Sequence, residues 1–301
     1  PAPRSLPSLD TAEGFEAHRA WEAEMAAERW SVVSWPEEYG GRGVGILEWL
    51  IFEEEYWRLQ APLRVSQNGI FLLAPTLFEF GTDEQKARFL PPMASAEEIW
   101  CQGWSEPDAG SDLAGIRSRA RRSDTEGGWV LSGQKTWASR GAFAEWCFGL
   151  FRTDPEAERH RGLTYFLIDL ATPGVTVRPI PQIDGETGFA ELFFEDVFVP
   201  DHLVLGDVGK GWNVAMTTLT YERGAAEGAG SGGGMSMDDR IRALVDLAKR
   251  TRRPGGKTAW DDAVVRDKVM QLAVRAEGFR QGSRIVARRS GLTRLGRGLF
   301  V

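Results

Sequence analysis

The sequence predicts an α+β protein in which helices, strands and helices form three successive blocks. Residues 10–100 place apolar side chains at helical spacing, residues 100–200 contain short β-branched and aromatic runs, and helical spacing returns from residue 211. This segregated order argues against the alternating βαβ pattern of a dinucleotide-binding domain. We therefore expect an N-terminal helical domain over 1–99, a central β-barrel or sandwich over 100–203, and an incomplete C-terminal helical bundle over 204–301.

The first block begins with two predicted helices separated by a turn. Asp10 and Glu13 have the spacing of a capping box, so a helix should follow them. Residues 35–41 contain proline and two glycines, which indicates a break in the chain. A second helix is expected over 46–59, where apolar residues recur on one side.

The rest of this block is predicted to be helical and largely buried. Residues 70–80 are strongly apolar, and Gly81 is a typical helix-ending residue. Thr82 and Gln85 have capping-box spacing, so they predict the start of another helix. We expect that helix to end at residues 90–92, Leu-Pro-Pro.

The central block contains five clear candidate strands, which Gly, Pro and Asp clusters separate. They lie at 129–131, 146–151, 163–168, 175–177 and 192–194. Helices are then predicted over 211–222, 238–249 and 260–289. The glycine-rich segment 224–234 follows a helix and not a strand, so it predicts a linker or a frayed helix end and no phosphate loop.

Composition excludes several function classes. No apolar run approaches the ~20 residues that span a bilayer, no signal peptide is recognisable, and Cys101 and Cys147 are too few for a disulfide scaffold. The three histidines are far apart in sequence, so no metal site is expected. These features predict a cytoplasmic protein without a membrane span. Because the chain opens on Pro1, we also expect an N-terminus that is missing or processed.

Charge is distributed unevenly along the chain. From residue 238 onward there are 16 Lys and Arg against 7 Asp and Glu, although the whole chain has a net charge of −7. A basic tail can bind nucleic acid. This one lacks the aromatic or glycine interleaving of RNA-binding segments, so we expect a solvated helical face and no nucleic-acid partner.

Two short runs carry most of the chemical information. Residues 101–112 read Cys-Gln-Gly-Trp-Ser-Glu-Pro-Asp-Ala-Gly-Ser-Asp, which suggests a strand that ends in a loop. Residues 133–139 read Gly-Gln-Lys-Thr-Trp-Ala-Ser and predict a strand with an aromatic ring and small hydroxyls. Hydrogen-bond donors on neighbouring strand ends, next to a flat aromatic ring, suit a planar heterocycle with many acceptors.

With three further segments, these runs resemble acyl-CoA dehydrogenases of the bacterial type. The additional segments are 36–41 (Pro-Glu-Glu-Tyr-Gly-Gly), 194–200 (Phe-Glu-Asp-Val-Phe-Val-Pro), and 209–216 leading to 221–223 (Tyr-Glu-Arg). The resemblance covers roughly residues 15–225, and the run Ser-Glu-Pro-Asp-Ala-Gly-Ser-Asp is its most specific part. It implies a helical domain, a β-barrel and a four-helix bundle, with FAD bound between barrel and bundle.

The same resemblance implies roles for individual residues. Ser105 would bond the polar edge of the flavin, and Ser139 would bond near N5 or the pyrimidine edge. Ser111 would lie by the thioester and pantetheine arm. The implied flavin-contacting residues are Gln102, Trp104, Ser105, Trp137 and Ser139, and the implied substrate-contacting residues are Ser111 and Tyr221. Trp104 and Trp137 could instead be core residues, since the chain has 12 Trp.

The catalytic base is less clearly indicated. Much of the family uses as its base a Glu in a C-terminal Tyr-Glu-Gly-Thr-like segment, which this chain lacks. The family's Arg-x-x-Phe-Gly element is also absent. The sequence therefore predicts a chain truncated at both ends. Glu222 matches the base of the isovaleryl- and long-chain-type subgroups, while Arg223 would orient carboxylates through an ion pair. Glu106, in the signature loop, is predicted to be a structural anion.

The resemblance implies FAD-dependent α,β-dehydrogenation of an acyl-CoA thioester to the 2-enoyl-CoA. Electrons would pass to an electron-transfer flavoprotein, and the enzyme would serve fatty acid or lipid catabolism as a homo- or hetero-oligomer. Two alternatives stay open. One is a non-catalytic partner subunit of a hetero-oligomeric acyl-CoA dehydrogenase. The other is a flavin monooxygenase-like relative on the same fold.

Overall fold

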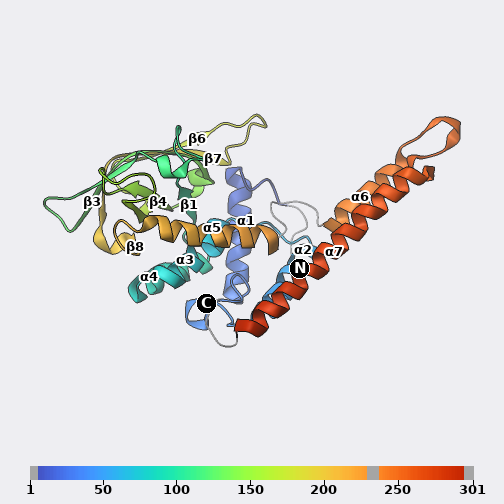
Figure 1. The fold of residues 1–301 in the computed structure, drawn as a ribbon, viewed down its shortest axis with the longest axis horizontal. Coiled ribbons are helices and arrows are strands. Elements are labelled where there is room, and N and C mark those ends of the chain that lie inside the picture. Colours follow the sequence, from blue (N-terminus) through green and yellow to red (C-terminus); the bar gives the residue numbers. More distant parts are fainter. Residues whose placement is uncertain (1–5, 229–236, 295–301) are drawn as a thin grey trace. The chain divides into compact units, whose positions relative to one another are not determined.

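The computed structural model describes residues 6–228 and 237–294, which form two compact units (Figure 1). The first unit comprises residues 6–44 and 62–225, and the second comprises residues 45–61, 226–228 and 237–294. The predicted order of helices, strands and helices is confirmed. Within the described ranges, no helix combines the length and apolarity that crossing a membrane requires.

The first helix of unit one begins one residue later than predicted. Helix α1 spans Ala12–Ala27, and its N-cap is Thr11, whose hydroxyl accepts a hydrogen bond from the Gly14 amide. The predicted cap, Asp10, is wrong because its carboxylate instead pairs with Arg140, at 3.5 Å. The local spacing matched a capping box, but a partner distant in sequence took the carboxylate.

The apolar run 70–80 forms a buried helical rod in two parts. Asn68–Leu73 is a π-helical turn, and it continues as α3, Ala74–Phe80, before Gly81 ends the helix in an extended conformation. A side chain at position 81 would meet the Leu77 carbonyl oxygen at 2.6 Å. The predicted burial is confirmed, with Leu73, Ala74 and Leu77 fully inaccessible.

Helix α4, Asp83–Ala94, has the capping box that the sequence predicted. The Thr82 hydroxyl accepts from the Gln85 amide, and the Gln85 side chain accepts from the Thr82 amide. The predicted end at residues 90–92 is wrong, since the helix continues through both prolines to Ala94. Carbonyls of the two prolines still accept bonds from the amides of residues 95, 97 and 98, so the final turn remains satisfied.

The strands form one mixed eight-stranded sheet with the order β6-β7-β3-β2-β4-β5-β8, and β1 pairs with β4. The bounds are β1 Trp100–Gly103, β2 Arg119–Arg122, β3 Gly128–Ser139, β4 Trp146–Arg152, β5 Leu163–Asp169, β6 Val175–Ile180, β7 Phe189–Pro200 and β8 Val204–Leu205. All five predicted runs lie in strands, whereas β2 and β8 were not predicted. Strands β4 and β5 are buried along almost their whole length, so the core lies there.

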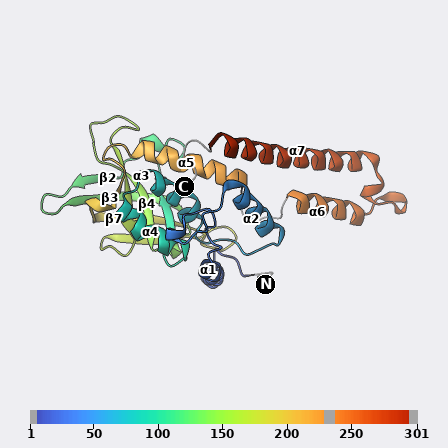
Figure 2. The same cartoon turned by 90° about the horizontal axis from the view of Figure 1, so that it is seen from below.

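Helix α5, Gly211–Gly228, packs against the core of unit one, and it lies beside α3 in both views (Figures 1 and 2). Thr218 of α5 is hydrogen-bonded to Thr76 of α3. Because α5 ends at Gly228, it extends beyond its predicted end at residue 222 and into the glycine-rich segment. Residues 229–236 of that segment lie outside the described residues.

The described part of the second unit contains three α-helices. They are α2, Ile46–Arg58, α6, Met237–Arg250, and α7, Ala263–Arg294. Helices α6 and α7 pack side by side, connected by the turns between residues 251 and 262. Val269 is buried in this unit, whereas Leu244 and Leu272 keep more than a third of their surface exposed.

Candidate ligand-binding site

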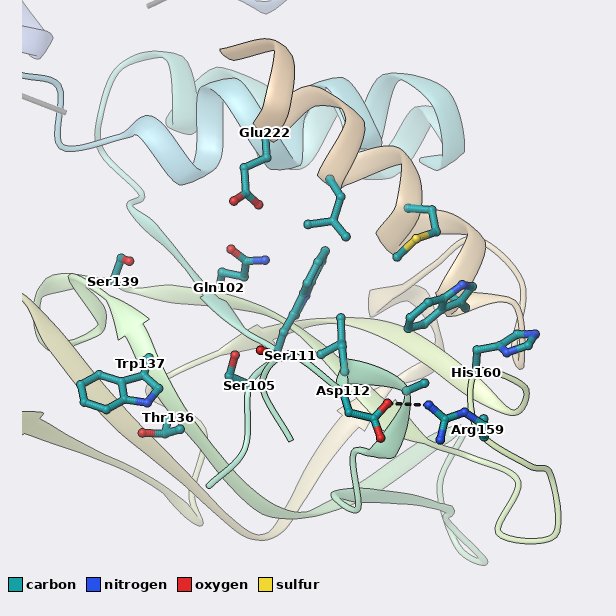
Figure 3. Close-up of a pocket in the computed structure, with 17 residues that line it drawn as sticks. Gln102, Ser105, Ser111, Asp112, Thr136, Trp137, Ser139, Arg159, His160 and Glu222 are labelled. Carbon is teal, nitrogen blue, oxygen red and sulfur yellow. Dashed lines mark hydrogen bonds and ion pairs between the residues drawn. The ribbon is translucent and has the colours of Figure 1, made fainter. Parts of the chain in front are cut away.

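One cavity of about 680 Å³ lies in unit one, between the strand ends of the sheet and helix α5 (Figure 3). This volume is within the range of small-molecule sites, ~300–1,000 Å³. The cavity brings together seven residues that the sequence singled out, which come from three separate segments. They are Gln102, Trp104, Ser105, Ser111, Trp137, Ser139 and Glu222.

A buried ion pair connects the loop after β1 to strand β3. Lys135 of β3 is fully buried, and its Nζ lies 2.8 Å from Glu106 Oε1 and 3.4 Å from the Trp104 carbonyl oxygen. The Glu106 carboxylate also accepts bonds from the Arg117 and Ser118 amides, at 2.6 and 2.9 Å. Glu106 is therefore engaged as a structural anion, which is the role expected from the sequence.

These contacts determine the charge of the pair. Burial opposes ionisation of Glu106, but the Lys135 charge and the hydrogen bonds outweigh it and lower the pKa of this carboxyl group. Burial lowers the pKa of Lys135, and Glu106 counteracts that effect. The ion pair connects residues 104–106 to β3. A backbone bond adds to this connection, since the Thr136 amide donates to the Ser105 carbonyl at 2.8 Å.

A bulge in β3 turns Trp137 toward the cavity. The pairing with β7 shifts between Lys135 and Ala138, and Trp137 has a positive φ of 60°. Lys135 and Ala138 stay buried, while Trp137 is 59% exposed and its ring contacts that of Phe189 edge to face. A positive φ is unfavourable for a bulky residue, and bulges commonly re-aim a side chain next to a functional site.

The small polar side chains of the cavity have unused hydrogen-bonding capacity. Within the part of the chain that the structure describes, the hydroxyls of Ser105, Ser111 and Ser139 and the Gln102 amide make no hydrogen bond to protein. The Trp104 indole nitrogen is buried and also lacks a partner there. Unpaired donors and acceptors that converge on one cavity indicate a polar ligand.

Helix α5 forms the opposite wall. Trp212, Met216, Leu219 and Glu222 recur every three or four residues and therefore line one face of the helix. Figure 3 shows Glu222 extending from α5 toward Gln102, with Ser105 and Ser139 on the sheet side. Tyr221 and Arg223 are on the same helix but do not line the cavity, so their predicted roles stay predictions.

Sequence reasoning missed a polar group at one end of the cavity. Arg159 Nη2 lies 2.5 Å from Asp112 Oδ1, and the His160 ring lies 5.8 Å from the Trp212 ring. Asp112 is the last residue of the run 101–112, and Trp212 has the helical spacing of Glu222, so both could have been found. Arg159 and His160 lie on the β4–β5 connection, whose path over the cavity is a tertiary feature.

Three domain models of one family match almost the whole chain. The acyl-CoA dehydrogenase N-terminal domain matches residues 5–97, the middle domain matches 101–197, and the C-terminal domain matches 209–291. The chain belongs to the acyl-CoA dehydrogenase family. Its signature residues 101–112 and 133–139 both lie in the middle domain of the family.

Similar proteins of the family include acyl-CoA dehydrogenase IpdE1 of Mycolicibacterium smegmatis. It is 43% identical over 273 residues, which are 86% of this chain and 66% of IpdE1. The chain thus spans slightly less than two-thirds of that relative's length.

Two solved structures have a similar fold. The ChsE4–ChsE5 complex from Mycobacterium tuberculosis is matched with a TM-score of 0.77 at 30% identity, over 94% of this chain and 71% of that one. The Tcur3481–Tcur3483 steroid acyl-CoA dehydrogenase is matched with a TM-score of 0.78 at 27% identity, over 92% and 68%.

Proposed function

We propose that this protein is an FAD-dependent acyl-CoA dehydrogenase that introduces an α,β double bond into an acyl-CoA thioester. The observation that carries the proposal is the placement of Glu222. Its carboxylate faces the free hydroxyls of Ser105 and Ser139 across one cavity (Figure 3). A proton acceptor opposite a polar, aromatic platform is what α-proton removal beside a redox cofactor requires.

The residues present fit a flavin. Ser105, Ser139 and Gln102 offer unpaired donors and acceptors for the polar edge of a heterocycle, and the exposed Trp137 offers a flat aromatic surface. The buried Trp104 adds an unpaired indole N–H. The cavity volume of about 680 Å³ also suits a ring system with part of a second ligand. When bound, FAD supplies the hydride acceptor.

The chain's own residues have three tasks in this reaction. Glu222 takes the α-proton at a carboxylate oxygen. Ser105 and Ser139 orient the flavin ring, and Ser111 lies by the thioester arm of the substrate. These roles follow from the family resemblance and agree with the cavity lining.

Partners and location are part of the same proposal. We expect electrons to pass to an electron-transfer flavoprotein, and we expect a homo- or hetero-oligomer, supported by the complex of two different chains formed by ChsE4 and ChsE5. A reducing cytoplasmic location is supported by Cys101 and Cys147, which are both free thiols.

The test is anaerobic bleaching of the purified yellow protein by straight-chain, branched and steroid acyl-CoA thioesters. Glu222→Gln should slow the reductive half-reaction by about 10²–10⁴-fold while flavin stays bound. Glu158→Gln, at an exposed position outside the cavity lining, is the matched control and should leave the rate unchanged. Colourless protein would favour a non-catalytic subunit, and a requirement for reduced nicotinamide would favour the monooxygenase alternative.

A further inference from the structure

Three hydroxyl side chains meet in the core of unit one, behind the cavity wall that α5 forms. Thr76 of α3, Tyr165 of β5 and Thr218 of α5 are each 0% exposed. Thr76 Oγ1 lies 2.9 Å from Thr218 Oγ1, and Tyr165 Oη lies 3.4 Å from the same atom. They therefore join a helix of the first block, a strand of the sheet and the helix that carries Glu222.

Each of these hydroxyls has one proton, and two backbone carbonyls compete for the protons of the threonines. Thr76 Oγ1 lies 2.7 Å from the Leu72 carbonyl oxygen, and Thr218 Oγ1 lies 3.2 Å from the Val214 carbonyl oxygen of its own helix. Thr76 and Thr218 can therefore share one hydrogen bond or donate to these carbonyls. Thr218 can also accept from Tyr165, whose phenol stays protonated because burial raises its pKa. A buried hydroxyl network of this kind restricts the movement of the elements that it joins.

Thr218 lies one helical turn before Glu222, so the two residues share nearly the same side of α5. The start of the helix is also constrained, because a side chain at Gly211 would lie 2.6 Å from the Thr164 backbone. A carboxylate roughly 6 Å from the helix axis moves about 1 Å when the helix rotates by about 10°. A displacement of about 1 Å can cost an enzyme about 10²-fold in rate.

The same hydroxyls are connected to the opposite wall of the cavity. The Tyr165 ring contacts Trp104 edge to face, with centroids 6.0 Å apart. Leu72, whose carbonyl oxygen is within hydrogen-bond distance of Thr76 Oγ1, lies in the π-helical turn that begins at Asn68. Asn68 Nδ2 donates to the Ser139 carbonyl at 3.4 Å. The hydroxyl network is thus in contact with both walls of the cavity, the one that α5 forms and the one that the sheet forms.

We propose that Thr218, held by Thr76 and Tyr165, is a positioning residue that sets the rotation of α5 and thereby places the Glu222 carboxylate in the cavity. The inference rests on the proposed function, since Glu222 acts as the base only in that reaction. It adds a determinant of rate that touches neither substrate nor cofactor.

The test compares three substitutions on α5. Thr218→Val keeps the shape and removes the hydroxyl, and Thr218→Ser restores it. Thr220→Val is the matched control. Thr220 is exposed and, within the described residues, its hydroxyl bonds only the Met216 carbonyl of its own helix, at 2.9 Å. The measured quantities are the rate of anaerobic flavin reduction at saturating acyl-CoA, the dissociation constant of the acyl-CoA, the flavin content and the melting temperature.

We expect Thr218→Val to slow flavin reduction by about tenfold or more, with flavin content and acyl-CoA affinity within about twofold of wild type. Thr218→Ser should recover most of the rate, and Thr220→Val should not change it. In a Glu222→Gln background, Thr218→Val should change the residual rate by less than about twofold, because its effect acts through the carboxylate. A purely structural role would lower the melting temperature and slow both backgrounds equally.

Three results would overturn the inference. The first is a wild-type rate for Thr218→Val, and the second is an equal loss in both Glu222 backgrounds. If Thr218→Val does not fold, Tyr165→Phe removes only the first donor, and an unchanged rate for that variant is the third. Wild-type protein that no acyl-CoA bleaches would instead overturn the proposed function, and this inference with it.

Discussion

Replacing Lys135 by methionine keeps the length of the side chain and removes one charge of the buried pair. Glu106 would then be a nearly inaccessible carboxylate that retains only its bonds from the Arg117 and Ser118 amides. Breaking one side of a buried ion pair costs about 3–5 kcal/mol. For a unit of about 200 residues, each kcal/mol lowers the melting temperature by roughly 2–4 °C, so a fall on the order of 10 °C is expected.

The double variant separates the charge effect from packing. Glu106→Gln with Lys135→Met removes both charges, and replacing a whole buried pair is often close to neutral. We expect the double variant to be more stable than Lys135→Met alone, with a coupling energy of about 2 kcal/mol or more. Lys86→Met is the control, since Lys86 pairs with the exposed Asp83 at 3.6 Å and should cost less than about 1 kcal/mol.

Acidity provides an independent check. The pKa of Glu106 is lowered in the folded protein, so its stabilising contribution is present at neutral pH and is lost as the pH falls below about 4.3. In Lys135→Met the unpaired Glu106 carboxyl group takes up a proton more readily. The difference in melting temperature between this variant and wild type should therefore become smaller toward about pH 4. Thermal melts of the variants across pH measure this difference. A Lys135→Met variant within about 1 kcal/mol of wild type at neutral pH would refute the reasoning.

Three further variants test the site and the fold. Ser105→Ala with Ser139→Ala should weaken FAD binding by about 1 kcal/mol per lost bond, and full occupancy in a flavin titration would contradict the assignment. Burial raises the pKa of Glu22, so wild-type stability should fall as the pH rises above about 4.3. Glu22→Gln should therefore lose less melting temperature than wild type over that rise, whereas parallel pH profiles would exclude this explanation. Thr11→Ala removes the α1 cap and should cost about 1 kcal/mol in a thermal melt, and an unchanged melting temperature would argue against the cap bond.

Local sequence determined the features whose partners are close along the chain. The capping box of Thr82 and Gln85 was predictable because its two bonds span three residues. The order of helical and strand blocks followed from the period of the apolar residues. The grouping of Ser105, Ser139 and Glu222 was predictable only through the resemblance of their motifs to one family.

Tertiary structure decided the features whose partners are distant along the chain. Asp10 is not the N-cap of α1, because its carboxylate pairs with Arg140. The role of Lys135 depended on Glu106, 29 residues away, and the direction of Trp137 depended on a bulge against β7. Thr76 and Thr218 are 142 residues apart, and only packing of α5 on α3 makes them neighbours. Periodicity and spacing describe one element at a time, whereas a buried charge or hydroxyl must be satisfied by whichever element the fold brings next to it.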